Sequence, residues 1–137
     1  MEPDAPTTKQ TTTVMWNRRT VQGEKRPWPD EVDTWLKDNS QSPREDFEAV
    51  HGKIFDRYPA WYRFTATSGA RTFELNLVPL HLKAMAEGSL RRNLAAKYLA
   101  AIVRRMIDTG EATQDWILGG DCNAPLAQGD FEPLTGA

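Results

Sequence analysis

A twenty-residue amphipathic stretch, set between two apolar runs, limits more than any other feature how this chain can fold. From Ser89 to Asp108, apolar residues at four-residue spacing form one stripe along a helix: Leu90, Leu94, Tyr98, Ile102 and Met106. Such a stripe has to be buried against another layer of secondary structure. We therefore predict a helix over Ser89–Asp108, with Ser89 as its N-cap and Gly110 ending it.

The same periodicity predicts which side of this helix faces the core. The buried set should include Leu94, Tyr98 or Leu99, Ile102 and Met106. The basic residues Arg91, Lys97 and Arg104 should lie largely in solvent. The second layer should then be a sheet made by the apolar runs on either side.

Those runs predict a hairpin before the helix and a strand after it. Trp61–Ala66 and Thr72–Leu82 are separated by the turn Ser68-Gly69-Ala70, and Phe73, Leu75 and Leu77 alternate onto one face. Pro79 lacks an amide donor, so the strand should be irregular or at an edge there. Asp115–Leu118 predicts a short buried strand, closed by Gly119-Gly120.

The remaining segments are less regular. We expect residues 1–10 to be a disordered tail, Thr11–Asn17 to form a strand, and another strand to enter near Phe55. Val21–Arg44 indicates a long loop with a helical turn from Pro29 to Lys37. The tail Phe131–Ala137 has no clear element. The fold class is therefore α/β, with one domain over residues 11–137.

Composition excludes some classes of protein. With 137 residues, 39% hydrophobic and 26% charged, the chain is long enough for one domain and has a soluble profile. No run approaches the roughly 18 apolar residues of a membrane span. The single cysteine, Cys122, excludes an internal disulfide and any multi-cysteine metal site. Localisation stays open, with an intracellular compartment favoured.

Charge is more informative in its distribution than in its net value of −2. The stretch from Lys83 to Arg105 holds six basic residues and one acidic residue, whereas all the charged residues after Arg105 are acidic. A basic helix beside an acidic end suits a phosphate and a cation respectively. A solvated helix face next to an acidic tail explains the same pattern without any function.

The strongest local signal is the segment G-G-D-C-N-A, Gly119–Ala124, at the end of the last apolar strand. Asp121 and Asn123 carry hard oxygen ligands two residues apart, which could lie beside Mg²⁺ or the water it activates. The alternative is an Asp/Asn turn, in which both side chains bond their own backbone.

Two other segments offer groups for a phosphate. His81, at the end of the hairpin's second strand, could donate a proton or hydrogen bond to a phosphate oxygen. Arg57 and Arg63 lie among aromatic residues and could track a phosphate backbone. A structural histidine and solvent-exposed arginines are the alternatives.

The order of these pieces resembles the middle of the endonuclease/exonuclease/phosphatase (DNase I-like) family. An "HL" strand, an "RR…A" helix and a "GDxN" strand end follow one another over about residues 11–134. The resemblance implies part of a four-layer α/β sandwich and a phosphoester hydrolase, either nuclease or phosphatase, that uses Mg²⁺ or Mn²⁺. Its substrate would be a phosphoester, with nucleic acid among the candidates.

The resemblance also implies roles for individual residues. His81 would be the proton donor or oxyanion stabiliser, Asp121 would orient or activate the attacking water, and Asn123 would bind a phosphate oxygen or the metal. Asp121 and Asn123 are thus the expected metal ligands, and Arg57 and Arg63 the expected substrate-binding residues. Arg92 matches a helix arginine expected to be structural. Cys122 stands where a bulky apolar residue is common.

The resemblance leaves two family segments without a match, a first strand pair with a metal-binding glutamate and a closing aspartate–histidine segment. We therefore expect the domain to be truncated at both ends, with weak Mg²⁺ binding and little or no hydrolysis by the isolated chain. One alternative is a non-catalytic binding module that keeps the scaffold. Another is an unrelated small α/β domain whose D-C-N is only a turn.

Overall fold

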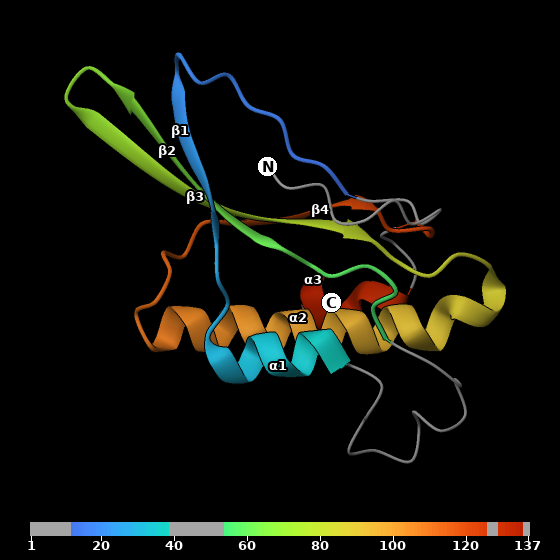
Figure 1. Ribbon diagram of the computed structural model, residues 1–137. Coiled ribbons are helices and arrows are strands. Elements are labelled where there is room, and N and C mark those ends of the chain that lie inside the picture. The colour runs from blue at the N-terminus through green and yellow to red at the C-terminus, as the bar shows by residue number, and fades with distance from the viewer. Residues whose placement is uncertain (1–11, 39–53, 126–128, 136–137) are drawn as a thin grey trace.

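The computed structural model of the chain describes residues 12–38, 54–125 and 129–135 (Figure 1). In chain order the elements are β1 (Val21–Arg26), α1 (Asp30–Asp38), β2 (Trp61–Ser68), β3 (Arg71–His81), the 3-10 turn η2 (Ala86–Gly88), α2 (Ser89–Asp108), β4 (Trp116–Asp121), the 3-10 turn η3 (Gly129–Phe131) and α3 (Glu132–Thr135). Helices and strands share one layered unit, so the predicted α/β class is confirmed.

The four strands form one mixed sheet in the order β1-β2-β3-β4. β1, β2 and β3 are antiparallel neighbours, and the β2–β3 hairpin closes through Gly69, which has φ 60°. β4 runs parallel to β3, and α2 makes the crossover between them. A parallel pair needs such a crossover, which is why the helix lies between these two strands in the sequence.

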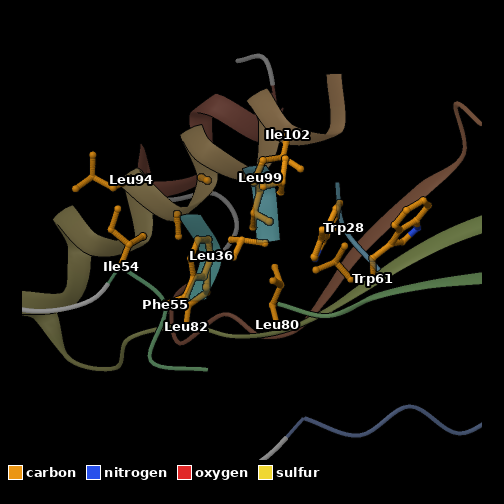
Figure 2. Packing of buried hydrophobic residues seen from close by; sticks show 14 of the residues in the cluster. Trp28, Leu36, Ile54, Phe55, Trp61, Leu80, Leu82, Leu94, Leu99 and Ile102 are labelled. Carbon is orange, nitrogen blue, oxygen red and sulfur yellow. The ribbon is translucent and has the colours of Figure 1, made fainter. Parts of the chain in front are cut away.

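The helices cover one face of the sheet, as Figure 1 shows for α1, α2 and α3. Val78, Leu80 and Leu82 point from β3 and its end toward this layer, and they are buried. Leu99 of α2 and Leu36 of α1 meet them (Figure 2). The core is therefore a two-layer interface between one sheet face and the helices.

Three tryptophans close one end of this core. Trp28, Trp61 and Trp116 stack with ring centroids 5.4 to 6.3 Å apart. Their polar atoms are satisfied: Trp61 Nε1 donates to Asn76 Oδ1 at 2.9 Å, and Trp28 Nε1 donates to the Pro59 carbonyl at 2.8 Å. Buried indoles keep such partners because an unmade hydrogen bond in the core is costly.

The other face of the sheet is more open. Phe73 and Ile117 are 53% and 48% exposed. Trp16 packs edge-on against Phe64, 5.4 Å between ring centroids, and so covers part of this face. Gly23 of β1 lies beneath both rings, where an added Cβ would come within 2.5 Å of Phe64 and 2.8 Å of Trp16.

Several sequence predictions are confirmed. The hairpin, the helix Ser89–Asp108 and its ending at Gly110 (φ 73°) are present, and the helical turn from Pro29 to Lys37 is α1. Leu94, Leu99, Ile102 and Met106 are buried, while Lys97 and Arg104 are exposed. At Pro79, β3 is paired only with β4 because the register with β2 ends at Leu77.

Other predictions about the strands are wrong. Residues 12–17 form no strand, and Phe55 lies in an irregular segment rather than at a strand entry. The first strand is instead Val21–Arg26, inside the predicted loop, because the free edge of β2 supplies its partner. β4 is only partly buried, since the described residues include no strand on its far side.

The ends of α2 also differ from expectation. Gly88 is the N-cap, and the Ser89 hydroxyl donates instead to the Asp130 carboxylate. Arg91 is buried because Asp56 provides a charged partner for it. The segment after residue 128 forms η3 and α3 with Phe131 in the core, although no element was expected there. The predicted tail of residues 1–10 lies outside the described residues.

Candidate functional site

His81 and Asp121 end two neighbouring parallel strands. They are register partners, so their side chains leave the sheet on the same face. Nε2 of His81 lies 3.8 Å from Oδ2 of Asp121. The two residues, which the sequence analysis identified in separate segments, thus lie side by side and line the same pocket.

Both side chains of this pair are accessible to solvent, and they lie farther apart than a direct hydrogen bond. The His81 side chain is 21% exposed and that of Asp121 is 62% exposed. A separation of 3.8 Å is longer than a hydrogen bond, so a water or a ligand oxygen could bridge the two groups. Chemically, the pair combines a carboxylate that accepts a proton with an imidazole that can donate one.

The backbone that presents Asp121 depends on the glycine before it. Gly120 has φ 146°, and a Cβ placed there would come within 2.1 Å of the Leu80 carbonyl oxygen. No other residue fits at that point of the β3–β4 pair. The strand can therefore run close to β3 up to the residue that carries the carboxylate.

The turn after Asp121 is held by two hydrogen bonds. The backbone N–H of Asn123 donates to Asp121 Oδ1 at 3.0 Å, and Asn123 Nδ2 donates to the Leu82 carbonyl at 2.8 Å. Asn123 has φ 54°, a conformation that asparagine tolerates. The Asp/Asn turn is thus present, and it leaves Asp121 Oδ2 directed toward His81.

The turn forms part of the wall of a polar pocket of about 420 Å³. Its lining includes His81, Asp121 and Asn123, together with Lys83 just after β3 and with Asp56 and Arg57 from the segment before β2. The structure therefore brings Arg57 to the same pocket as His81, Asp121 and Asn123. Arg57 lies in the irregular segment before β2, and this segment lines the pocket together with the end of β3.

Arg63 is not brought to this pocket. It is the register partner of Asn76, whose side chain is buried on the helix-covered face, whereas His81 lies on the other face. The Arg63 guanidinium donates to Glu74, with Nε–Oε1 at 3.1 Å. In this structure Arg63 is a cross-strand ion-pair partner.

A second, mainly apolar hollow of about 440 Å³ adjoins the first. It shares His81 and Asp121 and continues over the open face of the sheet, past Pro79 and Gly119, under residues 12–15. The pair therefore stands where a polar pocket meets an apolar one.

Sequence reasoning missed Asp56 and Lys83. Asp56 Oδ1 accepts a hydrogen bond from Arg91 Nη2 at 2.8 Å, and Asp56 Oδ2 lies 4.0 Å from Lys83 Nζ. Asp56 directly precedes Arg57 in the sequence, but only the fold shows that it lies beside α2 and the end of β3.

Cys122 lies between the two polar residues of the turn. It packs partly against the core, and this burial raises the pKa of its thiol, with the charge of Asp121 raising it further. A thiol with a raised pKa is mostly protonated at neutral pH, which makes it a weak nucleophile and metal ligand.

Arg92 is buried and structural, as expected. Its Nε donates to Asp130 Oδ2 at 2.7 Å, and Nη1 donates to the carbonyls of Lys83 and Met85, each at 2.8 Å. Burial raises the pKa of Asp130, but the hydrogen bonds from Ser89 and Arg92 outweigh it, so that the pKa is lowered. This network fixes the segment after β3 on which Lys83 stands.

The donor set meets the needs of a divalent cation only in part. Within the described residues, no group of three or more histidine, cysteine, aspartate or glutamate side chains could hold a metal ion. Asp121 and the amide oxygen of Asn123 are the adjacent hard donors. Mg²⁺ bound there would depend mainly on waters and phosphate oxygens, an arrangement common for this ion.

No protein-family model, curated protein or solved structure matches this chain. Among the helices of the described residues, none is long and apolar enough to cross a membrane.

Proposed function

We propose that the polar pocket binds a phosphoester and forms part of the active site of a metal-dependent phosphoester hydrolase, a nuclease or phosphatase. The observation that carries the proposal is the meeting of His81 and Asp121 at 3.8 Å, at the ends of parallel strands. Open α/β sheets commonly bind ligands beyond the carboxyl ends of their strands.

In this proposal the two residues divide the acid–base work. The Asp121 carboxylate orients a water and accepts its proton as the water attacks phosphorus in line with the leaving oxygen. The His81 imidazole donates a hydrogen bond or a proton to a phosphate oxygen as negative charge develops. Their exposure and the pocket of about 420 Å³ that both residues line leave room for a phosphate and a water.

Two further residues would hold the substrate and a cation. Arg57 lines the pocket and can bind phosphate oxygens through its guanidinium. Asp121 and Asn123 would hold Mg²⁺ or Mn²⁺, which when bound neutralises phosphate charge. The Asn123 side chain is well placed because its Nδ2 is already bonded to Leu82, which fixes the direction of the amide.

The finer fold proposal concerns the open face of the sheet. Helices cover one face, while apolar residues such as Phe73 and Ile117 remain exposed on the other. We propose that this sheet and its helices are one half of a DNase I-like four-layer sandwich, because a second sheet on that face would bury these side chains.

One observation favours a second candidate, a binding module without hydrolytic activity. The described residues contain no group of three metal-binding side chains. A pocket that keeps Arg57 and His81 could still bind a phosphate without hydrolysing it, since anion binding needs no activated water.

Hydrolysis of bis-p-nitrophenyl phosphate by the purified chain separates these candidates. With Mg²⁺ or Mn²⁺ we expect slow, metal-dependent turnover that Asp121→Ala abolishes, while the exposed control Asp108→Ala keeps it. Turnover that does not depend on metal or on Asp121 would reject the hydrolase. Fast turnover would instead reject the expectation that this ligand set is incomplete.

A further inference from the structure

Asp56 and Lys83 line the polar pocket and belong to a charged cluster that has no role in the proposed chemistry. Asp56, before β2, bridges two cations from different segments. Its Oδ1 accepts from Arg91 Nη2 of α2 at 2.8 Å, and its Oδ2 lies 4.0 Å from Nζ of Lys83, which follows β3. The carboxylate thus joins the helix, the β2 entry and the end of β3.

The two cations differ in burial. The Arg91 side chain is 9% exposed, whereas those of Lys83 and Asp56 are 41% and 42% exposed. The guanidinium is therefore fixed in the protein interior and neutralises the charge of Asp56. The Lys83 ammonium, on its flexible four-carbon stem, is accessible from the pocket.

The main chain of Lys83 is also fixed. Its carbonyl accepts a hydrogen bond from buried Arg92 Nη1 at 2.8 Å, and its Cγ lies close to Gly88, where an added Cβ would come within 2.9 Å of it. The backbone of Lys83 is therefore held in place, while its side chain stays 41% exposed and lines the pocket beside Asp56.

We infer that Lys83 binds a phosphate oxygen of the ligand, and that Asp56, anchored by Arg91, is the positioning residue that keeps the Lys83 ammonium at the pocket. This inference rests on the proposed function, in which the pocket takes a phosphoester. It adds a second cation beside Arg57 and assigns a role to a carboxylate that would otherwise repel the ligand.

Because of that repulsion, the direction in which Asp56→Asn changes phosphate affinity distinguishes two roles for Asp56. If Asp56 acted only through its charge, Asp56→Asn would tighten phosphate binding, because a negative charge beside the anion is removed. If Asp56 positions Lys83, the same change weakens binding, because the ammonium is no longer held at the pocket. Lys83→Gln should weaken binding in either case.

The test is an NMR titration of the full chain with inorganic phosphate, following the His81 ring and the Asp121 amide. We expect Lys83→Gln to raise the Kd by about 10-fold or more, as for loss of one hydrogen bond to a charged group. Asp56→Asn should raise it by a smaller factor, about 2- to 4-fold, since the ammonium still reaches the pocket part of the time. Asp56→Glu should stay close to wild type.

Matched controls separate local from general charge effects. Lys97→Gln and Asp108→Asn change the same charges at exposed positions of α2 and should leave the Kd unchanged. An unchanged Kd in Lys83→Gln, or a tighter one in Asp56→Asn, overturns the inference. Because Lys83 is 41% exposed, its substitution should not prevent folding even if that of Asp56 does.

The failure of this inference can be told apart from that of the proposed function. Phosphate that shifts His81 and Asp121 equally in wild type and Lys83→Gln overturns the role of Lys83 and leaves the phosphate pocket standing. Phosphate that shifts neither residue in wild type shows that the pocket takes no phosphate, and then both proposals fail.

Discussion

Two side-chain pairs, Arg92–Asp130 and His81–Asp121, differ in how far each is enclosed by the protein. Arg92 and Asp130 lie 2.7 Å apart with side chains 4% and 11% exposed, and Arg92 also donates to two backbone carbonyls. His81 and Asp121 lie 3.8 Å apart and are 21% and 62% exposed. The first pair is enclosed by partners within the protein, whereas the second meets solvent in a pocket.

This difference in burial indicates a structural role for the Arg92–Asp130 pair and leaves the His81–Asp121 pair available for a ligand. A buried ion pair tolerates the loss of neither partner, because the remaining charge stays in a low-dielectric environment. A pair that faces a pocket can lose one partner at little cost to folding, since water solvates the other. Stability should therefore respond strongly to changes at the Arg92–Asp130 pair and weakly to changes at the His81–Asp121 pair.

Arg92→Ala should lower the free energy of unfolding by about 3–5 kcal/mol, because it leaves the Asp130 carboxylate buried without its cation. The matched control is Arg104→Ala on the exposed side of the same helix, which should change stability by no more than about 0.5 kcal/mol. Urea unfolding of the three proteins measures both values. Equal losses in the two variants would contradict the structural role of Arg92.

Gly120→Ala should destabilise the chain by about 1–3 kcal/mol, because φ 146° and the Leu80 carbonyl both exclude a side chain. The control is Gly110→Ala, which has a positive φ of 73° but no atom within 4 Å of its Cβ. The loss in Gly120→Ala should exceed that in the control, as measured by thermal unfolding. Equal losses would show that the close approach of β3 and β4 is unimportant.

Lowering the pH should destabilise the fold through protonation of Asp130 in the buried pair. The pKa of this carboxyl is lowered in the folded chain, so its contribution to stability is full above the pKa of the unfolded state and is lost as pH falls through the folded value. The free energy of unfolding should therefore decline below pH about 4. Asp130→Asn, itself less stable at neutral pH, should show a shallower decline over that range.

His81→Gln should change stability by less than about 1 kcal/mol, because the pocket can hydrate the new side chain. Metal-dependent turnover should nevertheless fall about 10²- to 10⁴-fold, the range for loss of a general acid. Urea unfolding and hydrolysis assays on the same preparation give the two values. A loss of stability as large as that of Arg92→Ala would show that His81 has a structural role, as Arg92 and Asp130 do.

The sequence predicted the elements whose pattern is local. The helical stripe from Leu90 to Met106 and the hairpin around Gly69 repeat at the periods of a helix and a strand, and both elements were found. Leu90, the first residue of the stripe, is however 40% exposed. β1 could not be predicted in this way, because Gly23 and its charged neighbours form a strand only through pairing with β2. The burial of Arg91 depends on Asp56, 35 residues away.

In the candidate site, too, the residues with a local sequence signal could be predicted and the others could not. His81 and Asp121 could be predicted because each ends an apolar strand, and parallel pairing then brings them together. Asp56 and Lys83 carry no such signal, since an irregular segment and a strand exit have no period to reveal their direction. Arg63 looked like Arg57 in sequence, but strand alternation places it on the helix-covered side.

The central claim is that the ends of β3 and β4 form a site for a phosphate and a divalent cation. Paramagnetic broadening by Mn²⁺ tests it directly and needs no turnover. Substoichiometric Mn²⁺ should broaden the amide signals of Asp121 and Asn123 and the ring signals of His81, and Asp121→Asn should remove the effect. Broadening that is confined to other acidic residues, or that persists in Asp121→Asn, would contradict the claim.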